Sequence, residues 1–127
     1  MLGKHIALST LAASALLLSA CGGGSSGLST RGAIAFSAST GNGAIVWKAV
    51  DQNAANDAAR SKCGGGDCQV VLQFSQCGAI SFSATNLVYG VAEGVSAEAA
   101  QQAANESCQA KGGQSCSAAP DGAAQCN

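Results

Sequence analysis

Two stretches of this chain resemble each other, and this internal similarity limits the fold more than any other feature of the sequence. Residues 32–40 read GAIAFSAST and residues 78–86 read GAISFSATN, so six of nine positions are identical. After one deletion the match continues, and the paired residues are Val46 with Val91, Val50 with Val95, and Cys63 with Cys108. Chance similarity between alanine-rich segments is the alternative, but the ordered match of several residue types favours a tandem repeat.

Each repeat reads as two strands, a helix and a further strand, which predicts an α+β domain of two tandem ββα(β) repeats. Ile34 and Phe36 alternate with small residues, as in a half-buried strand. Glycine and asparagine at 41–43 favour a turn, because both residues tolerate positive φ. The predicted units are a signal segment at 1–20, a tether at 21–30, and one domain at 31–127 with repeats at 31–77 and 78–127.

The helices have recognisable starts. Asp51 and Ser96 occupy matching positions that suit an N-cap. The alanines at 54, 55, 58 and 59 are expected on one helical face, where they let the helix approach a sheet. Residues 69–74 predict a third strand, whereas their counterpart at 117–125 contains proline and glycine and has little strand character.

The core is thin, so the cysteines are expected to stabilise it. Aromatic residues make up 4% of the chain, and much of its hydrophobic content is alanine, which buries little area per residue. Small domains of this kind usually need covalent staples. Apart from Cys21, the cysteines number three in each repeat: Cys63, Cys68, Cys77, Cys108, Cys116 and Cys126. Because three is odd, complete pairing within the chain requires at least one bridge between the repeats.

The spacing of the cysteines indicates which ones pair. The extended strand at 69–74 would carry Cys77 about 20 Å from Cys68, whereas a bridge needs Cα atoms within about 7 Å. Cys68 can instead meet Cys63 across a short reversal, and Cys116 can meet Cys108 in the same way. Cys77 and Cys126 then pair across the repeats. Zinc binding is the alternative use of these cysteines, but their spacing is poor for a zinc knuckle, and we predict no metal site.

The first residues resemble a bacterial lipoprotein signal. A short cationic start precedes an apolar run at 6–18, which is too short to span a bilayer but fits a signal peptide. It ends in Leu-Ser-Ala before Cys21, similar to the lipobox at which bacteria acylate a cysteine before cleavage. An ordinary secretory signal is the alternative. We expect lipid on Cys21 to anchor the chain through a Gly/Ser tether. Because Gly22 rather than aspartate follows Cys21, bacterial sorting rules imply the outer membrane, with the protein facing the periplasm.

The sequence lacks the residues that several common functions need. His5, the one histidine, lies in the predicted signal segment, which leaves no imidazole for triad catalysis or metal binding in the mature chain. The net charge of −1 gives no basic footprint for nucleic acid. No cofactor motif is present, and no acidic pair has a recognisable catalytic spacing. Trp47 and Tyr89 stand out in a chain poor in aromatics and are candidate binding residues, with core filling as the alternative.

The cysteine and glycine pattern resembles a known bacterial family, the domain of unknown function 4189. The motifs that carry the resemblance are GAIAFS at 32–37, CGGGDC at 63–68, VVLQF at 70–74, CGAI at 77–80, and the glycine pair before Cys116. The resemblance covers roughly residues 31–127, and the weak strand at 117–125 departs from it. It implies a small exported domain, and it supplies no catalytic residues.

The predicted function is that of an envelope lipoprotein that binds another protein, as an inhibitor-type module, and that is not an enzyme. The alternative is a hydrolase acting on a cell-envelope polymer. The absence of histidine and of a paired acidic motif favours the binding module.

Overall fold

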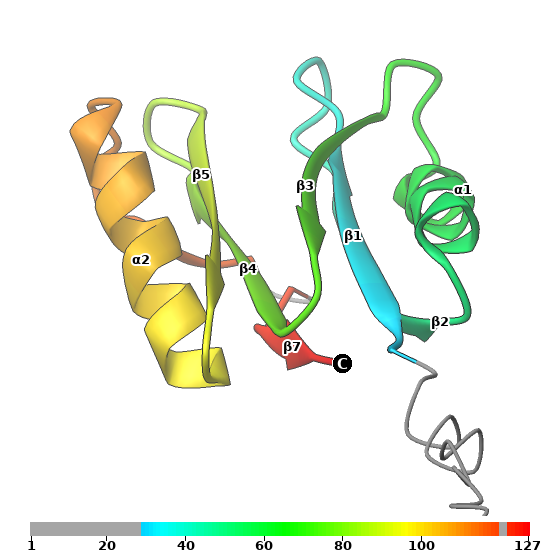
Figure 1. The fold of residues 1–127 in the computed structure, drawn as a ribbon. Coiled ribbons are helices and arrows are strands. Elements are labelled where there is room, and N and C mark those ends of the chain that lie inside the picture. Colours follow the sequence, from blue (N-terminus) through cyan, green and yellow to red (C-terminus); the bar gives the residue numbers. More distant parts are fainter. Residues whose placement is uncertain (1–28, 120–121) are drawn as a thin grey trace, which may run out of the picture.

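Two sheets lie face to face, and one helix covers the outer face of each sheet (Figure 1). The computed structural model describes residues 29–119 and 122–127. Over these residues it confirms the predicted α+β class, with two helices, two sheets and three disulfides. The predicted signal segment and the tether up to residue 28 lie outside the described residues.

The elements follow one order in both halves of the chain. The first half contains β1 (Arg31–Phe36), β2 (Gly43–Ala49), α1 (Gln52–Cys63) and β3 (Gln69–Phe74). The second half contains β4 (Cys77–Ser83), β5 (Val88–Gly94), α2 (Ala97–Ala110), β6 (Ser117–Ala118) and β7 (Gln125–Cys126). β1 lies between β2 and β3, and β4 lies between β5 and the short strands β6 and β7. All pairs are antiparallel. The weak strand signal at 117–125 thus corresponds to two short pieces.

Strand β1 illustrates how alternation builds the layers. Ile34 and Phe36 belong to the cluster between the two sheets, whereas Ala33 and Ala35 belong to the cluster beneath α1. All four side chains are buried. Because successive side chains of a strand point to opposite faces, the large residues fill the space between the sheets and the alanines let the helix come close.

The helices begin at the predicted N-caps, which the structure confirms. The side chain of Asp51 accepts a hydrogen bond from the backbone N–H of Ala54 at 2.7 Å, and Ser96 caps α2 in the same way. Each cap satisfies one of the backbone donors that a helix start leaves unpaired. α1 ends at Gly64, whose φ of 75° is a left-handed conformation that glycine adopts without steric cost.

The buried face of each helix is narrower than the predicted alanine face. The buried residues are Ala55, Ala59 and Cys63 in α1, and Ala100, Ala104 and Cys108 in α2. They stand four residues apart and form one row, so Ala58 is left exposed. Each row of alanines ends at a cysteine whose disulfide holds the loop that follows.

The sequence match between the two halves contains a one-residue deletion, which was expected before Val46. A β-bulge in β2 places it after Val46 instead. Ile45 pairs with the isoleucine of β1, as Val91 pairs with the isoleucine of β4. Ile45 therefore occupies the position that corresponds to Val91, and the predicted match with Val46 is wrong. β2 has one residue more than the stretch of β1 that it faces, and Lys48 in this region has a φ of 57°. The bulge absorbs the extra residue.

The three disulfides link the ends of elements. Cys63–Cys68 and Cys108–Cys116 span the loops after α1 and α2, with Cα atoms 6.2 and 6.1 Å apart. Cys77–Cys126 joins β4 to β7 across 49 residues of sequence and connects the two halves. These are the same three pairs that the spacing of the cysteines indicates.

Candidate functional site

The outer edge of β3 borders a groove. Within the described residues, β3 pairs with β1 alone, so its second edge is open. The groove has a volume of about 600 Å³ and lies between this edge and α1. We call it the edge groove, and the residues lining it are Asn56, Arg60, Cys68 and residues 69–73.

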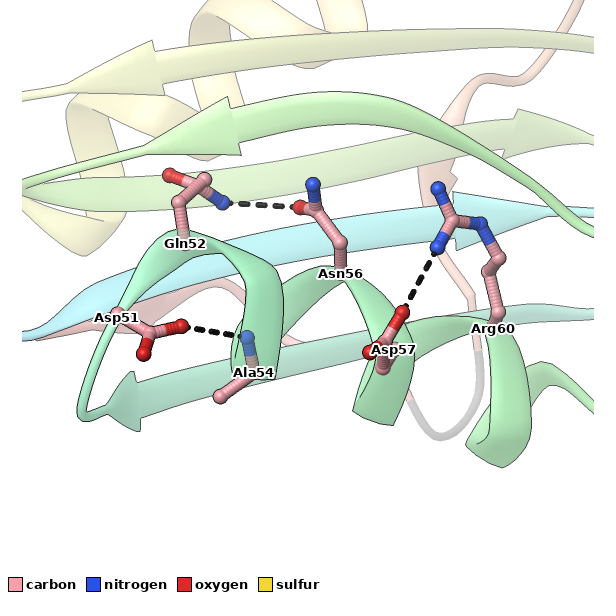
Figure 2. A network of polar contacts seen from close by, with 6 residues as sticks. All are labelled: Asp51, Gln52, Ala54, Asn56, Asp57 and Arg60. Carbon is pink, nitrogen blue, oxygen red and sulfur yellow. Dashed lines mark hydrogen bonds and ion pairs between the residues drawn. The ribbon is translucent and has the colours of Figure 1, made fainter.

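A row of polar side chains follows α1, and two of its three members, Asn56 and Arg60, line the edge groove. Gln52, Asn56 and Arg60 stand four residues apart and extend from the same side of the helix (Figure 2). Gln52 Nε2 donates to Asn56 Oδ1 at 3.0 Å and to the carbonyl of Gly32 at 3.1 Å. Arg60 Nη1 lies 3.1 Å from Asp57 Oδ1, and both side chains are largely exposed. Such an exposed pair is weak, so the guanidinium can exchange Asp57 for another carboxylate.

Helix α2 carries the same type of amide pair. Gln101 Nε2 donates to Asn105 Oδ1 at 3.1 Å and to the carbonyl of Ile80 at 3.4 Å. In both helices a glutamine amide thus satisfies a carbonyl of the central strand beneath it. This shared contact makes Gln52 a structural residue and leaves Asn56 and Arg60 as the polar groups that face the edge groove.

The strand that borders the edge groove carries both apolar and polar side chains. Val70, Val71 and Leu72 are partly exposed, and the flanking glutamines Gln69 and Gln73 are exposed. β3 has one residue more than the stretch of β1 that it faces, which places a bulge in the middle of this apolar run. Val70 packs beneath α1, whereas Val71 and Leu72 pack against the cluster between the sheets. What the groove offers is therefore the open backbone of β3 beside polar side chains, which suits an extended peptide.

Asp67 is one of two carboxylates in the described part of the chain whose pKa is lowered. The hydroxyl of Ser37 donates to Asp67 Oδ1, and the backbone N–H of Ser39 donates to Oδ2 at 3.2 Å. Hydrogen bonds from these serines hold the pKa of Asp67 below its ordinary value. Ser37 is itself fully buried at the end of β1. The contact therefore fastens the loop after α1 to the sheet.

Glu93 is the second such carboxylate. Its Oε1 accepts hydrogen bonds from the backbone N–H groups of Ser75 and Gln76, at 3.0 and 3.3 Å, and from the Ser75 hydroxyl. The bond from the Ser75 backbone is the main cause of its lowered pKa. A general acid for glycoside hydrolysis needs the opposite, a raised pKa. The lowered pKa of each carboxylate therefore does not suit the general-acid role.

The two candidate aromatic residues lie in one cluster. Trp47 and Tyr89 are partly buried and pack against the side chains between the sheets. The Tyr89 ring centroid is 4.3 Å from that of Phe36. Lys62 Nζ lies 5.5 Å from the Trp47 ring centroid, and Lys111 Nζ lies 4.7 Å from that of Tyr89, which are cation–π distances. Neither ring lines the edge groove.

Three further points concern the predicted lipid anchor, membrane spans and metal sites. Cys21, the predicted lipidation site, lies outside the described residues. Among the residues that are described, no helix is long and apolar enough to cross a membrane. The same residues contain no group of three or more potential ligands that could hold a metal ion.

Sequence reasoning missed the edge groove. The strand at 69–74 is predictable, but its place at the end of a sheet depends on pairing with a strand far away in sequence. The one local signal is the pair of glutamines that flank the apolar run, Gln69 and Gln73.

The comparisons with known proteins agree with the resemblance seen in the sequence. The chain matches no curated protein and no solved structure. A family model described as Domain of unknown function (DUF4189) matches residues 32–120, which cover both helices and the strands from β1 to β6. The chain therefore belongs to the DUF4189 family.

Proposed function

We propose that this chain is a lipid-anchored protein of the bacterial cell envelope and that its folded domain binds a partner protein. The observation that carries the proposal is the open edge of β3 beside the edge groove. An unpaired strand edge presents backbone N–H and C=O groups that a second chain can satisfy. The partner segment would be extended, with its backbone paired to β3 and a carboxylate near Arg60.

The anchor is the second part of the proposal. The lipobox-like residues before Cys21 support acylation there, and three disulfides suit an oxidising compartment such as the periplasm. The following Gly22 supports the outer membrane as the destination. A domain on a flexible tether in this place would meet envelope proteins, which fits an inhibitor-type module.

Cys21→Ser tests the anchor. Metabolic labelling with a palmitate analogue should mark the wild-type protein, and the variant should lose both the label and its place in the membrane fraction. Cys77→Ser with Cys126→Ser is a matched control, because it removes other thiols and should keep the label. Undiminished labelling of the Cys21→Ser variant would contradict the proposal.

Site-specific crosslinking tests the edge groove. A photoreactive benzoylphenylalanine at position 73 should crosslink to a distinct protein in living cells, whereas the same group at position 106, exposed on α2, should not. Once that partner is identified and purified, Arg60→Glu should weaken its binding about tenfold or more, because a charge-assisted hydrogen bond becomes a repulsion. Lys111→Glu makes the same charge change outside the groove and should leave binding unchanged. Equal crosslinking at positions 73 and 106 would count against the groove.

The alternative of a hydrolase acting on envelope polymer stays a prediction. Incubation of the purified protein with peptidoglycan, followed by chromatography of the soluble products, tests it directly. Release of fragments that depends on Asp67 or Glu93 would favour the hydrolase over the binding module. The binding role of Trp47 and Tyr89 likewise stays a prediction.

We also propose that the two halves are tandem repeats, as the sequence match predicts. The shared order of elements, the equivalent N-caps and the matching buried rows support this. In the second half the third strand would have shrunk to β6 and β7. A family member with a stronger strand signal after its second helix should contain one continuous strand paired with the equivalent of β4. Absence of such a strand there would weaken the proposal.

A further inference from the structure

The described part of the chain exposes three large hydrophobic side chains, and two of them occupy matching positions in the two halves. Val50 and Val95 are 80% and 81% exposed, and Leu87 is 73% exposed. Val50 follows the last residue of β2, Val95 follows the last residue of β5, and each directly precedes the N-cap of a helix. The two valines are therefore the same local feature, present once in each half.

The packing of the domain does not use these two valines. An apolar residue just before an N-cap often packs against the fourth residue of the helix, as a hydrophobic staple. The fourth residues here are Ala55 and Ala100, and both are 0% exposed beneath their helices. Val50 and Val95 thus remain in solvent. A single exposed valine is common on protein surfaces, so the argument depends on where the two lie together.

Both valines lie at one end of the domain. Val50 follows a residue that pairs with Arg31 at the start of β1, and Val95 follows a residue that pairs with Cys77 at the start of β4. The starts of β1 and β4 are close together, because the Phe74 ring packs against the second residue of each strand. Figure 1 shows the turn from β5 to α2 and the C-terminus at the lower end of the view, and the loop between β4 and β5 at the upper end.

The proposed anchor reaches the domain at this same end. Arg31 stands ten positions after Cys21, and a chain of ten residues spans at most about 35 Å even when fully extended. Lipid on Cys21 would therefore hold this end of the domain within that distance of the bilayer, and we call it the tether end. Leu87 lies at the opposite end, because it precedes the first residue of β5, whereas Val95 follows the last.

The charges at the tether end do not select an anionic lipid. Arg31 and Lys48 are basic, whereas Asp51, Glu93 and Glu98 are acidic. Asp51 and Glu93 already accept hydrogen bonds from backbone N–H groups of the domain. A contact made at this end would therefore come from its apolar side chains, and it would form on a zwitterionic membrane.

We infer that the tether end docks on the lipid surface, with Val50 and Val95 inserted at the boundary between headgroups and acyl chains. The inference rests on the proposed lipid anchor and not on the edge groove. Two valines bind a membrane weakly on their own, but the tether makes the contact intramolecular and raises the effective concentration of lipid at this end. Docking would fix the orientation of the domain, with the loop between β4 and β5 pointing away from the membrane.

Quenching of tryptophan fluorescence by brominated lipid tests the inference. The full-length protein is purified from bacterial membranes and reconstituted in phosphatidylcholine vesicles with bromine on the acyl chains near the glycerol. Trp47→Phe removes the single tryptophan, and Val50→Trp, Val95→Trp or Leu87→Trp then places one reporter. At positions 50 and 95 the fluorescence should fall about twofold against vesicles without bromine, because side chains at the boundary lie within reach of the bromine. At position 87 it should stay unchanged.

The comparison contains two matched controls. Leu87→Trp shows how far tryptophan itself draws a surface toward lipid, because this residue favours the membrane interface. With Val95→Trp as the reporter, Val50→Glu should remove most of the quenching, whereas Leu87→Glu, the same kind of change at the other end, should leave it intact.

The mass of the N-terminal peptide from the same preparation reports the anchor separately. Lipid on Cys21 together with equal quenching at positions 50, 95 and 87, or with none at 50 and 95, would overturn this inference alone. An unmodified Cys21 would overturn the anchor and the inference with it. Photolabelling of the unsubstituted protein by a phospholipid with a diazirine on its acyl chain needs no variant. The label should appear at Val50 and Val95 and not at Leu87, and the reverse distribution would overturn the inference even if the tryptophan variants fail to fold.

Discussion

Phe74 packs against glycines of two strands that belong to different sheets. Its ring is 2% exposed and lies between Gly32 of β1 and Gly78 of β4. A Cβ added at Gly32 or Gly78 would come within 2.2 or 2.4 Å of ring atoms, far closer than real contacts. These two glycines are equivalent in the sequence match, and together they form the slot for a single ring.

Gly78→Ala should therefore destabilise the domain. The added methyl group must displace a buried ring that has no space to move, and overpacking of this kind costs about 1–3 kcal/mol. The measurement is the free energy of unfolding in urea under oxidising conditions. Gly66→Ala is the control, because nothing lies within 4 Å of a Cβ at Gly66. Equal stability of the two variants would mean that the slot around Phe74 is not tight.

Glu93 predicts a specific dependence on pH. Its folded-state pKa is lowered from the ordinary value of 4.5, mainly by the backbone N–H of Ser75. A lowered pKa gives stability that is present above pH 4.5 and is lost as the pH falls through the folded-state pKa. Glu93→Gln should remove part of the acid dependence of the urea midpoint below that pH. Glu106→Gln, an exposed carboxylate on α2, should keep it. An identical pH profile for wild type and Glu93→Gln would contradict this account.

Residue roles could be predicted where their causes are local. The N-caps Asp51 and Ser96 contact donors three residues away, so the sequence alone identifies them. Glu93 instead caps a turn 17 and 18 residues away in sequence, and the slot for Phe74 joins three strands. No local pattern indicates such contacts, because they exist only once the strands have paired.

At the scale of elements, α2 lies against β5 with almost no side chain between them. A Cβ added at Gly90 would come within 2.3 Å of the Cys108 backbone nitrogen and 2.6 Å of the Ala104 carbonyl oxygen. At Gly94 it would meet the backbone of Ala100 at 2.5 Å. By strand register the residue equivalent to Gly90 in the first half is Ala44, so glycine permits the closer approach in the second half.

Gly90→Ala should accordingly push α2 away from its sheet. The added methyl group would clash with helix backbone rather than with a flexible side chain. We therefore expect the free energy of unfolding to fall by about 1–3 kcal/mol. Hydrogen exchange should rise in α2 and remain unchanged in α1, which serves as the internal control. Equal exchange in both helices would contradict a local displacement.

Element types were more predictable than their partners. The strands at 31–36 and 69–74 and both helices follow from periodicity and caps. The position of the one-residue deletion between the two halves could not be predicted, because a β-bulge near Lys48 shifts the register without a clear sequence signal. The edge groove was missed for the same reason, since an open edge is a property of the sheet and not of the strand.

At the scale of the whole molecule, neither half has a complete core of its own. The cluster between the sheets combines Ile34 and Phe74 from the first half with Ile80 from the second. The last residues of the chain add further links between the halves. Besides the bridge from Cys77, the side chain of Asn127 accepts a hydrogen bond from Lys48 N–H at 2.7 Å and donates one to the Phe74 carbonyl at 3.1 Å.

The Cys77–Cys126 bridge should be the most important of the three for stability. It closes the longest loop, 49 residues against 5 and 8. Loop entropy alone then predicts about 4 kcal/mol for this bridge and about 2 kcal/mol for Cys63–Cys68. It also holds β7 on β4 and places Asn127 at the bulge of β2.

Replacing Cys77 and Cys126 together with serine leaves no stray thiol and tests this order directly. The variant should lose more stability in urea than the matched variant that replaces Cys63 and Cys68. Hydrogen exchange should become fast over residues 122–127 and at Lys48, whose backbone N–H loses its acceptor, while both helices stay protected. If the Cys63 and Cys68 variant is the less stable of the two, loop length does not govern these bridges. If the helices lose protection together with the last residues, the bridge holds the entire domain, because the shared core then cannot form without it.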